Sequence, residues 1–233
     1  MIKLEKTDVF GWEAAIRGMR NPMNSWDKSD SEYRYWCDCL GPDEEPHYCT
    51  HCKFDQCSPY TGTPDFVIGE NDLKLMKSLS KAGSDHAKYL RMINITVDIT
   101  APLYWWKEYD TYKVGTVANS CSTMHKIQAK EFTLNDFSIE HLNQDVIDKP
   151  FKDIVNCLNF FRGLYLQHKD KDDWWQMIQL LPSSYNQKRT VQLNYQVLKN
   201  IYHSRKNHKL DEWHVFCEWI ENLPYAKELI CGE

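Results

Sequence analysis

The sequence predicts a single mixed α/β domain with a cysteine-rich insertion near its N-terminus, and three observations lead to this expectation. Apolar and polar residues alternate over 93–99, which is the pattern of a half-buried strand. Apolar residues recur at helical spacing through 151–165, 195–202 and 210–220. Five cysteines fall within 37–57, a stretch with little periodicity.

Length and composition favour one large domain over 1–233. Hydrophobic residues make up 42% of the chain, which supplies enough apolar surface for a core. The 28 basic and 33 acidic residues give a net charge of −5, so nothing favours general nucleic-acid binding. Because no stretch approaches the ~18 apolar residues of a membrane helix and residues 1–10 do not resemble a signal peptide, we expect a soluble, cytoplasmic protein that binds no membrane.

The N-terminal third combines regular elements with the insertion. Alternation over 2–10 predicts a strand, and 12–19 is typical of a short helix. The stretch 21–69 holds the cysteine cluster and most of the prolines, so we expect an irregular insertion. Helices are predicted over 70–81 and 84–91.

The C-terminal half is predicted to be more helical. Pro102 follows the strand over 93–99 and begins a short helix. The apolar stripe of 151–165 continues through 174–181 as a helical pattern. A short strand is expected over 189–193, before the last two helical stripes.

The paired cysteines predict a structural zinc site. Cys37 and Cys39 form one close pair, and Cys49 and Cys52 form another. Thiolates at this spacing can fold two arms of chain onto one tetrahedral zinc, which would order a segment with few apolar residues. The alternative is a loop of reduced cysteines. Further candidate ligands are His47, His51 and Cys57.

Function is expected in two polar segments, 102–126 and 181–214. Within the first, 112–125 gathers small and hydroxylic residues that let a backbone approach a ligand. The alternative is an ordinary surface turn. Cys121 has no histidine partner fixed by spacing, so we expect an inert thiol rather than a nucleophile.

Arg205 is the most informative residue of the second segment. It follows Leu198 by seven residues and therefore lies on the apolar stripe of its helix. A guanidinium there stays charged, so it needs a carboxylate, a phosphate or several carbonyl acceptors. The alternative to a ligand is an internal ion pair, for example with Asp211 or Glu218. The residues expected to join Arg205 around an anion are Lys188 and Arg189.

Two ordered sets of residues carry a family resemblance. The C-terminal set is Leu181-Pro182, Thr190-Val191, Leu193-Asn194, Leu198 and Arg205. The upstream set is Ala101-Pro102, Lys107-Glu108-Tyr109, Lys113 and Thr116-Val117. Their order and spacing resemble the flavin-dependent thymidylate synthases, over about 84–126 and 176–214.

The resemblance implies a fold, an activity and an assembly. It implies a homotetramer whose sites lie between subunits, with FAD as cofactor and a pyrimidine deoxynucleotide as small-molecule partner. In that family, reduced flavin supplies hydride, methylenetetrahydrofolate supplies carbon, and dUMP becomes dTMP without a protein nucleophile. By this resemblance Arg205 polarises the pyrimidine as the catalytic residue, and Asn194 faces the flavin.

This chain departs from the family at its signature Arg-His-Arg-x-x-Ser. The positions of the three charged residues hold Thr111, Tyr112 and Lys113, and Thr116 keeps the hydroxyl. Further substitutions place Asn119 for a glutamate, Cys121 for a second serine, and Thr123 and Met124 for an Arg-Tyr pair. Since the family arginines hold FAD and the nucleotide phosphate, two alternatives stay open: a nucleotide- or anion-binding protein without flavin chemistry, and a zinc-stapled interaction protein. The residues expected to bind nucleotide or cofactor are Lys113, Thr116, Asn119, Lys188, Arg189, Asn194 and Arg205.

Overall fold

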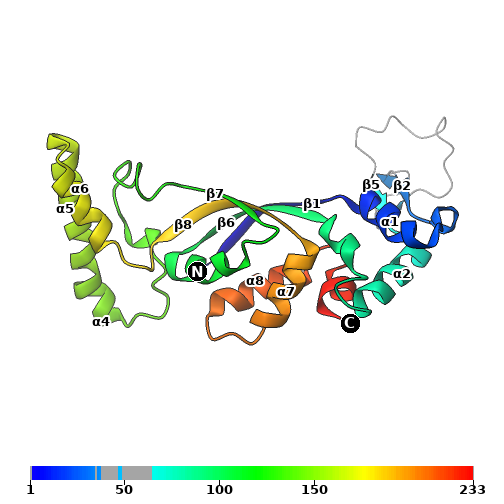
Figure 1. The fold of residues 1–233 in the computed structure, drawn as a ribbon. Coiled ribbons are helices and arrows are strands. Elements are labelled where there is room, and N and C mark those ends of the chain that lie inside the picture. The colour runs from blue at the N-terminus through cyan, green and yellow to red at the C-terminus, as the bar shows by residue number, and fades with distance from the viewer. Residues whose placement is uncertain (1, 35, 38–46, 49–64, 233) are drawn as a thin grey trace.

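A four-stranded antiparallel sheet forms the centre of the molecule, with strand order β1-β6-β8-β7 (Figure 1). The structure is a computed structural model that describes residues 2–34, 36–37, 47–48 and 65–232, of which 36–37 and 47–48 are described only as backbone. The sheet strands are β1 (Lys3–Phe10), β6 (Asn94–Pro102), β7 (Val117–Ser120) and β8 (Asn186–Asn194). This sheet and the surrounding helices confirm the mixed α/β class expected from the sequence.

Strand β6 is the strand that the alternation predicts. Ile95, Val97 and Ile99 are buried, and the residues between them are partly exposed. The whole of β6 pairs with β8, so the strand predicted over 189–193 is longer than expected at its N-terminal side. That extension depends on pairing with β6, because the polar residues that begin β8 have no strand pattern of their own.

Helices cover one face of the sheet. They are α3 (Leu103–Tyr109), α7 (Tyr195–Arg205) and α8 (Asp211–Glu221). Figure 1 shows α7 and α8 on the same side of the sheet, and none of the described helices covers the opposite side. The core between these helices and the sheet is aromatic, since Trp105, Trp106, Trp213 and Phe216 are fully buried, and the Trp105 ring centroid lies 4.8 Å from that of Trp213.

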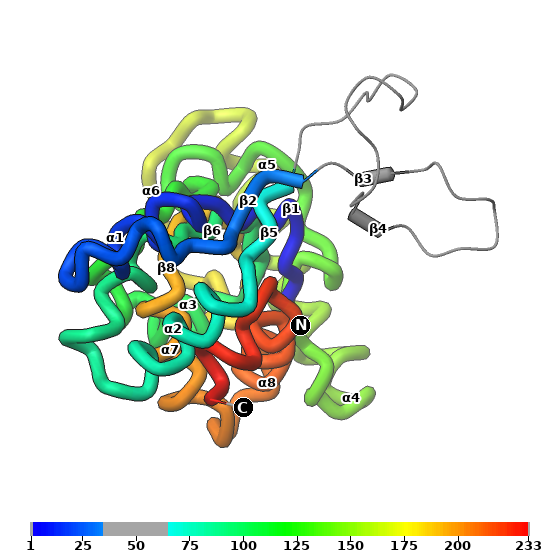
Figure 2. The backbone as a smooth tube through the Cα atoms, turned by 90° about the vertical axis from the view of Figure 1, so that its right-hand side faces the viewer, coloured from blue at the N-terminus to red at the C-terminus, as the bar shows by residue number. Residues whose placement is uncertain are grey.

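The insertion is attached at one end of the sheet. The elements there are α1 (Trp12–Arg20), α2 (Glu70–Lys81), β2 (Glu32–Arg34) and β5 (Asp65–Val67). Strand β2 pairs with β5, and Arg34 faces Asp65 in that pair, so the chain leaves and returns at adjacent positions (Figure 2). The strands β3 (Trp36–Cys37) and β4 (His47–Tyr48) also pair with each other.

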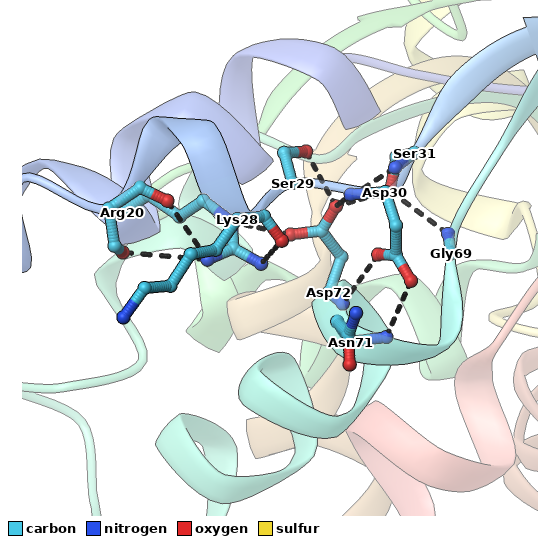
Figure 3. Close-up of polar contacts among 9 residues, drawn as sticks. Arg20, Lys28, Ser29, Asp30, Ser31, Gly69, Asn71 and Asp72 are labelled. Atoms are coloured by element: carbon cyan, nitrogen blue, oxygen red, sulfur yellow. Dashed lines mark hydrogen bonds and ion pairs between the residues drawn. The ribbon is translucent and has the colours of Figure 1, made fainter.

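A buried ion pair joins the two sides of this attachment. Arg20 at the end of α1 donates from Nε to Asp72 Oδ1 at 2.6 Å, and both side chains are almost completely buried. Asp72 also accepts from the hydroxyls of Ser29 and Ser31, at 2.7 and 2.6 Å. In the other direction, the Asp30 carboxylate accepts from the backbone N–H groups of Asn71 and Asp72 in the first turn of α2 (Figure 3). The network therefore fixes the chain before the insertion to the helix after it.

A helical hairpin projects from the other end of the sheet (Figure 1). It consists of α5 (Lys152–His168) and α6 (Lys171–Leu180), with its own small core around Leu158 and Met177. The single helical pattern expected across 151–181 is thus two helices. Lys169 adopts a left-handed φ of 57° to end α5, and Asp170 caps α6 by accepting from the Asp172 N–H.

Several local expectations need correction. Residues 84–91 form turns and a short 3-10 helix, Lys88–Arg91, rather than an α-helix beginning at Ser84. The segment 21–69 was expected to be irregular, but β2, β5 and two 3-10 turns order its described ends. The remaining short elements are Asn21–Met23, Trp26–Lys28, Asp110–Tyr112, Leu134–Asp136, α4 (Gln144–Val146), Ile147–Phe151 and Lys227–Cys231. Across the described ranges, every helix is too short or too polar to cross a membrane.

Candidate functional site

Helix α3 is the element around which the predicted site residues gather. Pro102 precedes its first turn, and the paired Trp105 and Trp106 anchor it in the core. The indole N–H of Trp106 donates to the Gln187 carbonyl at 2.9 Å, which fixes α3 against β8. The opposite side of α3 therefore presents Glu108 towards α7 and α8.

One carboxylate oxygen of Glu108 accepts two hydrogen bonds and lies close to a histidine ring nitrogen. Its Oε2 lies 2.8 Å from Arg205 Nη1 and 3.2 Å from both Trp213 Nε1 and His208 Nε2. Arg205 also donates from Nε to the Tyr112 hydroxyl at 2.8 Å, and its guanidinium lies 4.8 Å from the Trp213 ring centroid. Arg205 is thus held in an internal ion pair, with Glu108 as the partner instead of Asp211 or Glu218.

The two other predicted cations are also paired. Arg189 Nη1 lies 2.8 Å from Asp110 Oδ1, and the Arg189 guanidinium lies 4.1 Å from the Trp106 ring centroid. Lys188 Nζ lies 3.0 Å from Asp98 Oδ2, and this hydrogen bond raises the pKa of the lysine. Each of these cations meets its own carboxylate, so the structure does not gather them with Arg205 around one anion.

The loop after α3 packs against the start of α7. Gly115 has a φ of 81°, and a Cβ there would lie 3.2 Å from Asn194 Nδ2, so the turn needs glycine. Asn194 Oδ1 accepts from the Val197 N–H and caps α7. The Thr116 hydroxyl donates to the Tyr112 carbonyl at 3.1 Å. Two of the predicted ligand residues, Asn194 and Thr116, therefore have local structural contacts.

Lys113 and Asn119 are exposed on this loop and on β7. Strand β7 was not expected, because 117–120 falls within the stretch interpreted as a turn or ligand loop. It pairs with β8 from Val117 to Ser120 and forms one edge of the sheet. The residues that follow β7 therefore lie beside the start of β8, where the Cys121 N–H donates to the Lys188 carbonyl at 2.9 Å.

The stretch 121–123 after β7 lines a cavity of about 560 Å³ that we call the cationic pocket. Four lysines from separate parts of the chain surround it, against one lining aspartate, Asp136. Its lining also includes Tyr185 and the stretch 121–123. The four lysines are Lys3, Lys126, Lys130 and Lys188.

The lysines of the cationic pocket differ in their partners. Lys130 forms an ion pair with Asp136, and Lys188 forms one with Asp98. Lys3 and Lys126 take part in no ion pair with another described residue. The pocket therefore offers two ammonium groups whose charge is not neutralised by a neighbouring carboxylate, beside the hydroxyls of the 121–123 stretch.

Sequence reasoning included only Lys188 among these four lysines. Lys3 lies on β1, whereas Lys126 and Lys130 lie in the loop after β7, so they are brought together only by the sheet order. Glu108 was also missed as the partner of Arg205. Both are consequences of tertiary contact between segments that lie far apart in the sequence, such as Glu108 and Arg205 at 97 positions, which no local spacing indicates.

The predicted zinc ligands lie at the limit of what the structure describes. Cys39, Cys49 and Cys52 lie outside the described residues, and Cys37 is described only as part of the backbone of β3. Within the described part of the chain, no group of three or more His, Cys, Asp or Glu side chains has the arrangement of a metal site. The zinc site stays a prediction.

Comparison with solved structures identifies the fold. A structure of the flavin-dependent thymidylate synthase ThyX from Helicobacter pylori, complexed with FAD and dUMP, matches with a TM-score of 0.63 and 15% sequence identity, over 98% of this chain and 97% of that one. A second structure of ThyX from Helicobacter pylori with FAD and dUMP gives the same TM-score and identity over 99% and 97%. No protein-family model and no curated protein sequence matches the chain. The chain therefore has the fold of the flavin-dependent thymidylate synthases.

Proposed function

We propose that this protein binds a nucleotide through its phosphate in the cationic pocket, and that the ligand is a pyrimidine deoxynucleoside monophosphate such as dUMP. The observation that carries the proposal is the cavity of about 560 Å³ with four lysines and one lining aspartate. Small-molecule sites commonly occupy about 300–1,000 Å³, so the size suits a mononucleotide.

The chemistry of the pocket suits a phosphate dianion. The ammonium groups of Lys3 and Lys126 attract it as point charges, and the hydroxyls of Ser122 and Thr123 can donate hydrogen bonds to its oxygens. The resemblance places one of the family's phosphate-holding arginines at the position of Thr123. Lysines from other elements therefore supply the charge that this stretch of sequence has lost.

The residues present fit a flavin less well. By the resemblance, the family's arginines hold FAD and the nucleotide phosphate. Thr111 and Lys113 stand at the two arginine positions of the signature, and only Lys113 keeps the charge. The Tyr112 hydroxyl already accepts from Arg205, and Asn194 caps α7. Lys113 is thus the one cation that these positions offer to the flavin diphosphate, so most of the anchors that the family uses are lost.

The loss of flavin anchors favours the nucleotide-binding alternative over methylation of the base. The catalytic role expected for Arg205 requires a guanidinium facing the pyrimidine, whereas Arg205 is paired with Glu108. A visible spectrum of the purified protein distinguishes the two functions. Bound flavin would give its oxidised absorption bands and support the methyltransferase expectation. A colourless protein that still binds dUMP supports nucleotide binding without flavin chemistry.

Calorimetric titration with dUMP tests the proposal directly. We expect Lys126→Ala to weaken binding at least about tenfold, or about 1.4 kcal/mol, because it removes one uncompensated charge. Affinity should also fall as salt concentration rises. Lys74→Ala, which alters an exposed lysine on α2, is the matched control and should leave affinity unchanged.

Two results would contradict the proposal. One is the absence of binding by the unmutated protein at millimolar nucleotide, with purine and pyrimidine monophosphates both tried. The other is an equal affinity in Lys126→Ala and Lys74→Ala, which would show that any nucleotide binds elsewhere.

A further inference from the structure

A second cavity lies where the C-terminal end of α2, the turn that follows it and one side of α7 meet (Figure 1). Its volume is about 400 Å³, and it shares no lining residue with the cationic pocket. Lys199 is the only lysine, arginine, aspartate or glutamate among the residues that line it, so we call it the Lys199 pocket.

Ser80 holds the Lys199 ammonium group in place without neutralising it. Lys199 Nζ donates to the Ser80 carbonyl at 2.9 Å and to the Ser80 hydroxyl oxygen at 2.6 Å. That hydroxyl itself donates to the Leu229 carbonyl at 2.9 Å, so its oxygen can accept from the lysine. An ammonium group carries three N–H donors, and these contacts use two of them. At least one donor therefore remains for a ligand in the cavity.

The positive charge of Lys199 is not balanced by a neighbouring carboxylate. It forms no ion pair with another described residue, whereas Lys130 and Lys188 each have an aspartate partner. Burial lowers the pKa of Lys199, and no charge of the described residues offsets this effect. Because an anion in the cavity would stabilise the charged form of the lysine, the Lys199 pocket is complementary to a negatively charged ligand.

Other hydrogen-bond donors lie around this ammonium group. The hydroxyls of Ser84 and Ser204 line the cavity, and neither forms a hydrogen bond with another described residue. Asn200 also lines it, and its Oδ1 accepts from Gln196 Nε2 at 3.1 Å, which leaves its Nδ2 group as a donor. The cavity thus combines one cation with three further donor groups, as the oxygens of an anion require.

We propose that the Lys199 pocket binds a small, hydroxylated monocarboxylate. One ammonium charge matches one carboxylate, whose two oxygens can accept from Lys199 and from a neighbouring hydroxyl. Ala87 is the only apolar side chain in the lining, so a polar ligand fits better than an alkyl acid. A phosphate dianion is matched instead by the two uncompensated ammonium groups of the cationic pocket, so this inference does not depend on the proposed function.

Titration of the full-length protein with lactate and with lactamide tests this assignment, because the two molecules have similar shapes and differ in charge. In protein isotopically labelled at the lysine Cε carbon, NMR resolves the lysine signals, and the Lys199 signal is the one that Lys199→Met removes. It should shift saturably with millimolar lactate. Lactamide at the same concentrations should leave it unmoved, because lactamide has no carboxylate to pair with the ammonium group.

Variants that keep Lys199 locate the ligand. Ser204→Ala removes a hydroxyl that is exposed on α7, so the fold should be kept, and lactate affinity should fall at least about threefold. Ser78→Ala removes an exposed hydroxyl on α2 outside the cavity and is the matched control. Lys126→Ala, in the cationic pocket, should also leave lactate affinity unchanged, which separates this site from the proposed nucleotide site.

Four outcomes would overturn the proposal. A Lys199 signal that does not respond to lactate would leave the lysine only a structural role, which is to bind a carbonyl in the last turn of α2. An equal response to lactamide would show that charge is not recognised. Equal lactate affinity in Ser204→Ala and Ser78→Ala would place the ligand outside the Lys199 pocket. Tighter binding of inorganic phosphate than of lactate at the Lys199 signal would exclude the choice of a monocarboxylate.

Discussion

Replacing Glu108 by glutamine should destabilise the protein, because it leaves the Arg205 charge partly buried without a counter-ion. The Arg205 side chain is 18% exposed and that of Glu108 is 35% exposed, so the pair lies between the buried and surface cases. Breaking a buried pair costs about 3–5 kcal/mol, and a surface pair contributes about 0–1 kcal/mol. After allowing for solvent screening at this exposure, we expect a loss of about 2 kcal/mol.

Chemical and thermal unfolding measure this loss. In a protein of this length, a change of about 1 kcal/mol shifts Tm by about 2–4 °C, so Glu108→Gln should lower Tm by about 4–8 °C. Asp148→Asn is the matched control, because Asp148 pairs with Lys152 at 2.8 Å and both side chains are about half exposed. That change should cost less than about 0.5 kcal/mol.

A double-mutant cycle with Arg205→Gln separates pairing from other effects. If the ion pair carries the stability, Glu108→Gln and Arg205→Gln should show a coupling energy of about 1 kcal/mol or more. The reasoning is refuted if Glu108→Gln changes the free energy of unfolding by less than about 0.5 kcal/mol while Arg205→Lys weakens dUMP binding tenfold. That combination would make Arg205 a ligand residue and not a structural one.

Three other predictions concern metal, assembly and acid. Elemental analysis of protein purified without added metal should find about one zinc per chain on Cys37, Cys39, Cys49 and Cys52, and loading below about a tenth of chains would contradict the site. Sedimentation should show the homotetramer implied by the resemblance, and a stable monomer at micromolar concentration would exclude it. Burial alone would raise the pKa of Asp72, but hydrogen bonds from Ser31, Ser29 and Arg20 hold it below its ordinary value, so the stability it contributes above pH ~4 should be lost as pH falls through the folded pKa. Between about pH 6 and 3, the melting temperature of the unmutated protein should therefore fall more steeply with decreasing pH than that of Asp72→Asn. Equal slopes of melting temperature against pH would contradict this.

The sequence predicts those elements whose pattern is complete within themselves. In β6 the buried residues alternate with partly exposed ones, and in α7 and α8 they recur at helical spacing. The type and position of these three elements therefore follow from local periodicity. Strand β7 is different, because all four of its residues are exposed and, within the described ranges, it pairs with β8 alone. No periodicity can indicate a strand whose side chains lie in solvent on both faces.

The site was harder to predict than the fold for an electrostatic reason. Sequence spacing correctly placed Arg205 among apolar neighbours, where its charge needs an acceptor. It did not indicate which acceptor, since Glu108 lies 97 positions away along the chain and reaches Arg205 through the packing of α3 on α7. A partly buried cation among apolar neighbours requires a negative charge, and only the tertiary structure shows whether a protein carboxylate or a ligand supplies it.

Some cations of this protein have a carboxylate partner and others do not, which explains why the cationic pocket is a better candidate for a phosphate than the Arg205 region. Arg189 and Arg205 each have a carboxylate within 2.8 Å, so an entering anion would have to compete with an existing ion pair. Lys126 and Lys3 lack such a neighbour among the described residues, so a phosphate there gains attraction without breaking a protein contact. By the resemblance, the family holds the nucleotide phosphate with arginines that this chain has replaced, so a ligand retained on this fold would be held by different side chains. The lysines that the sheet order brings together from β1, β8 and the loop after β7 meet that requirement.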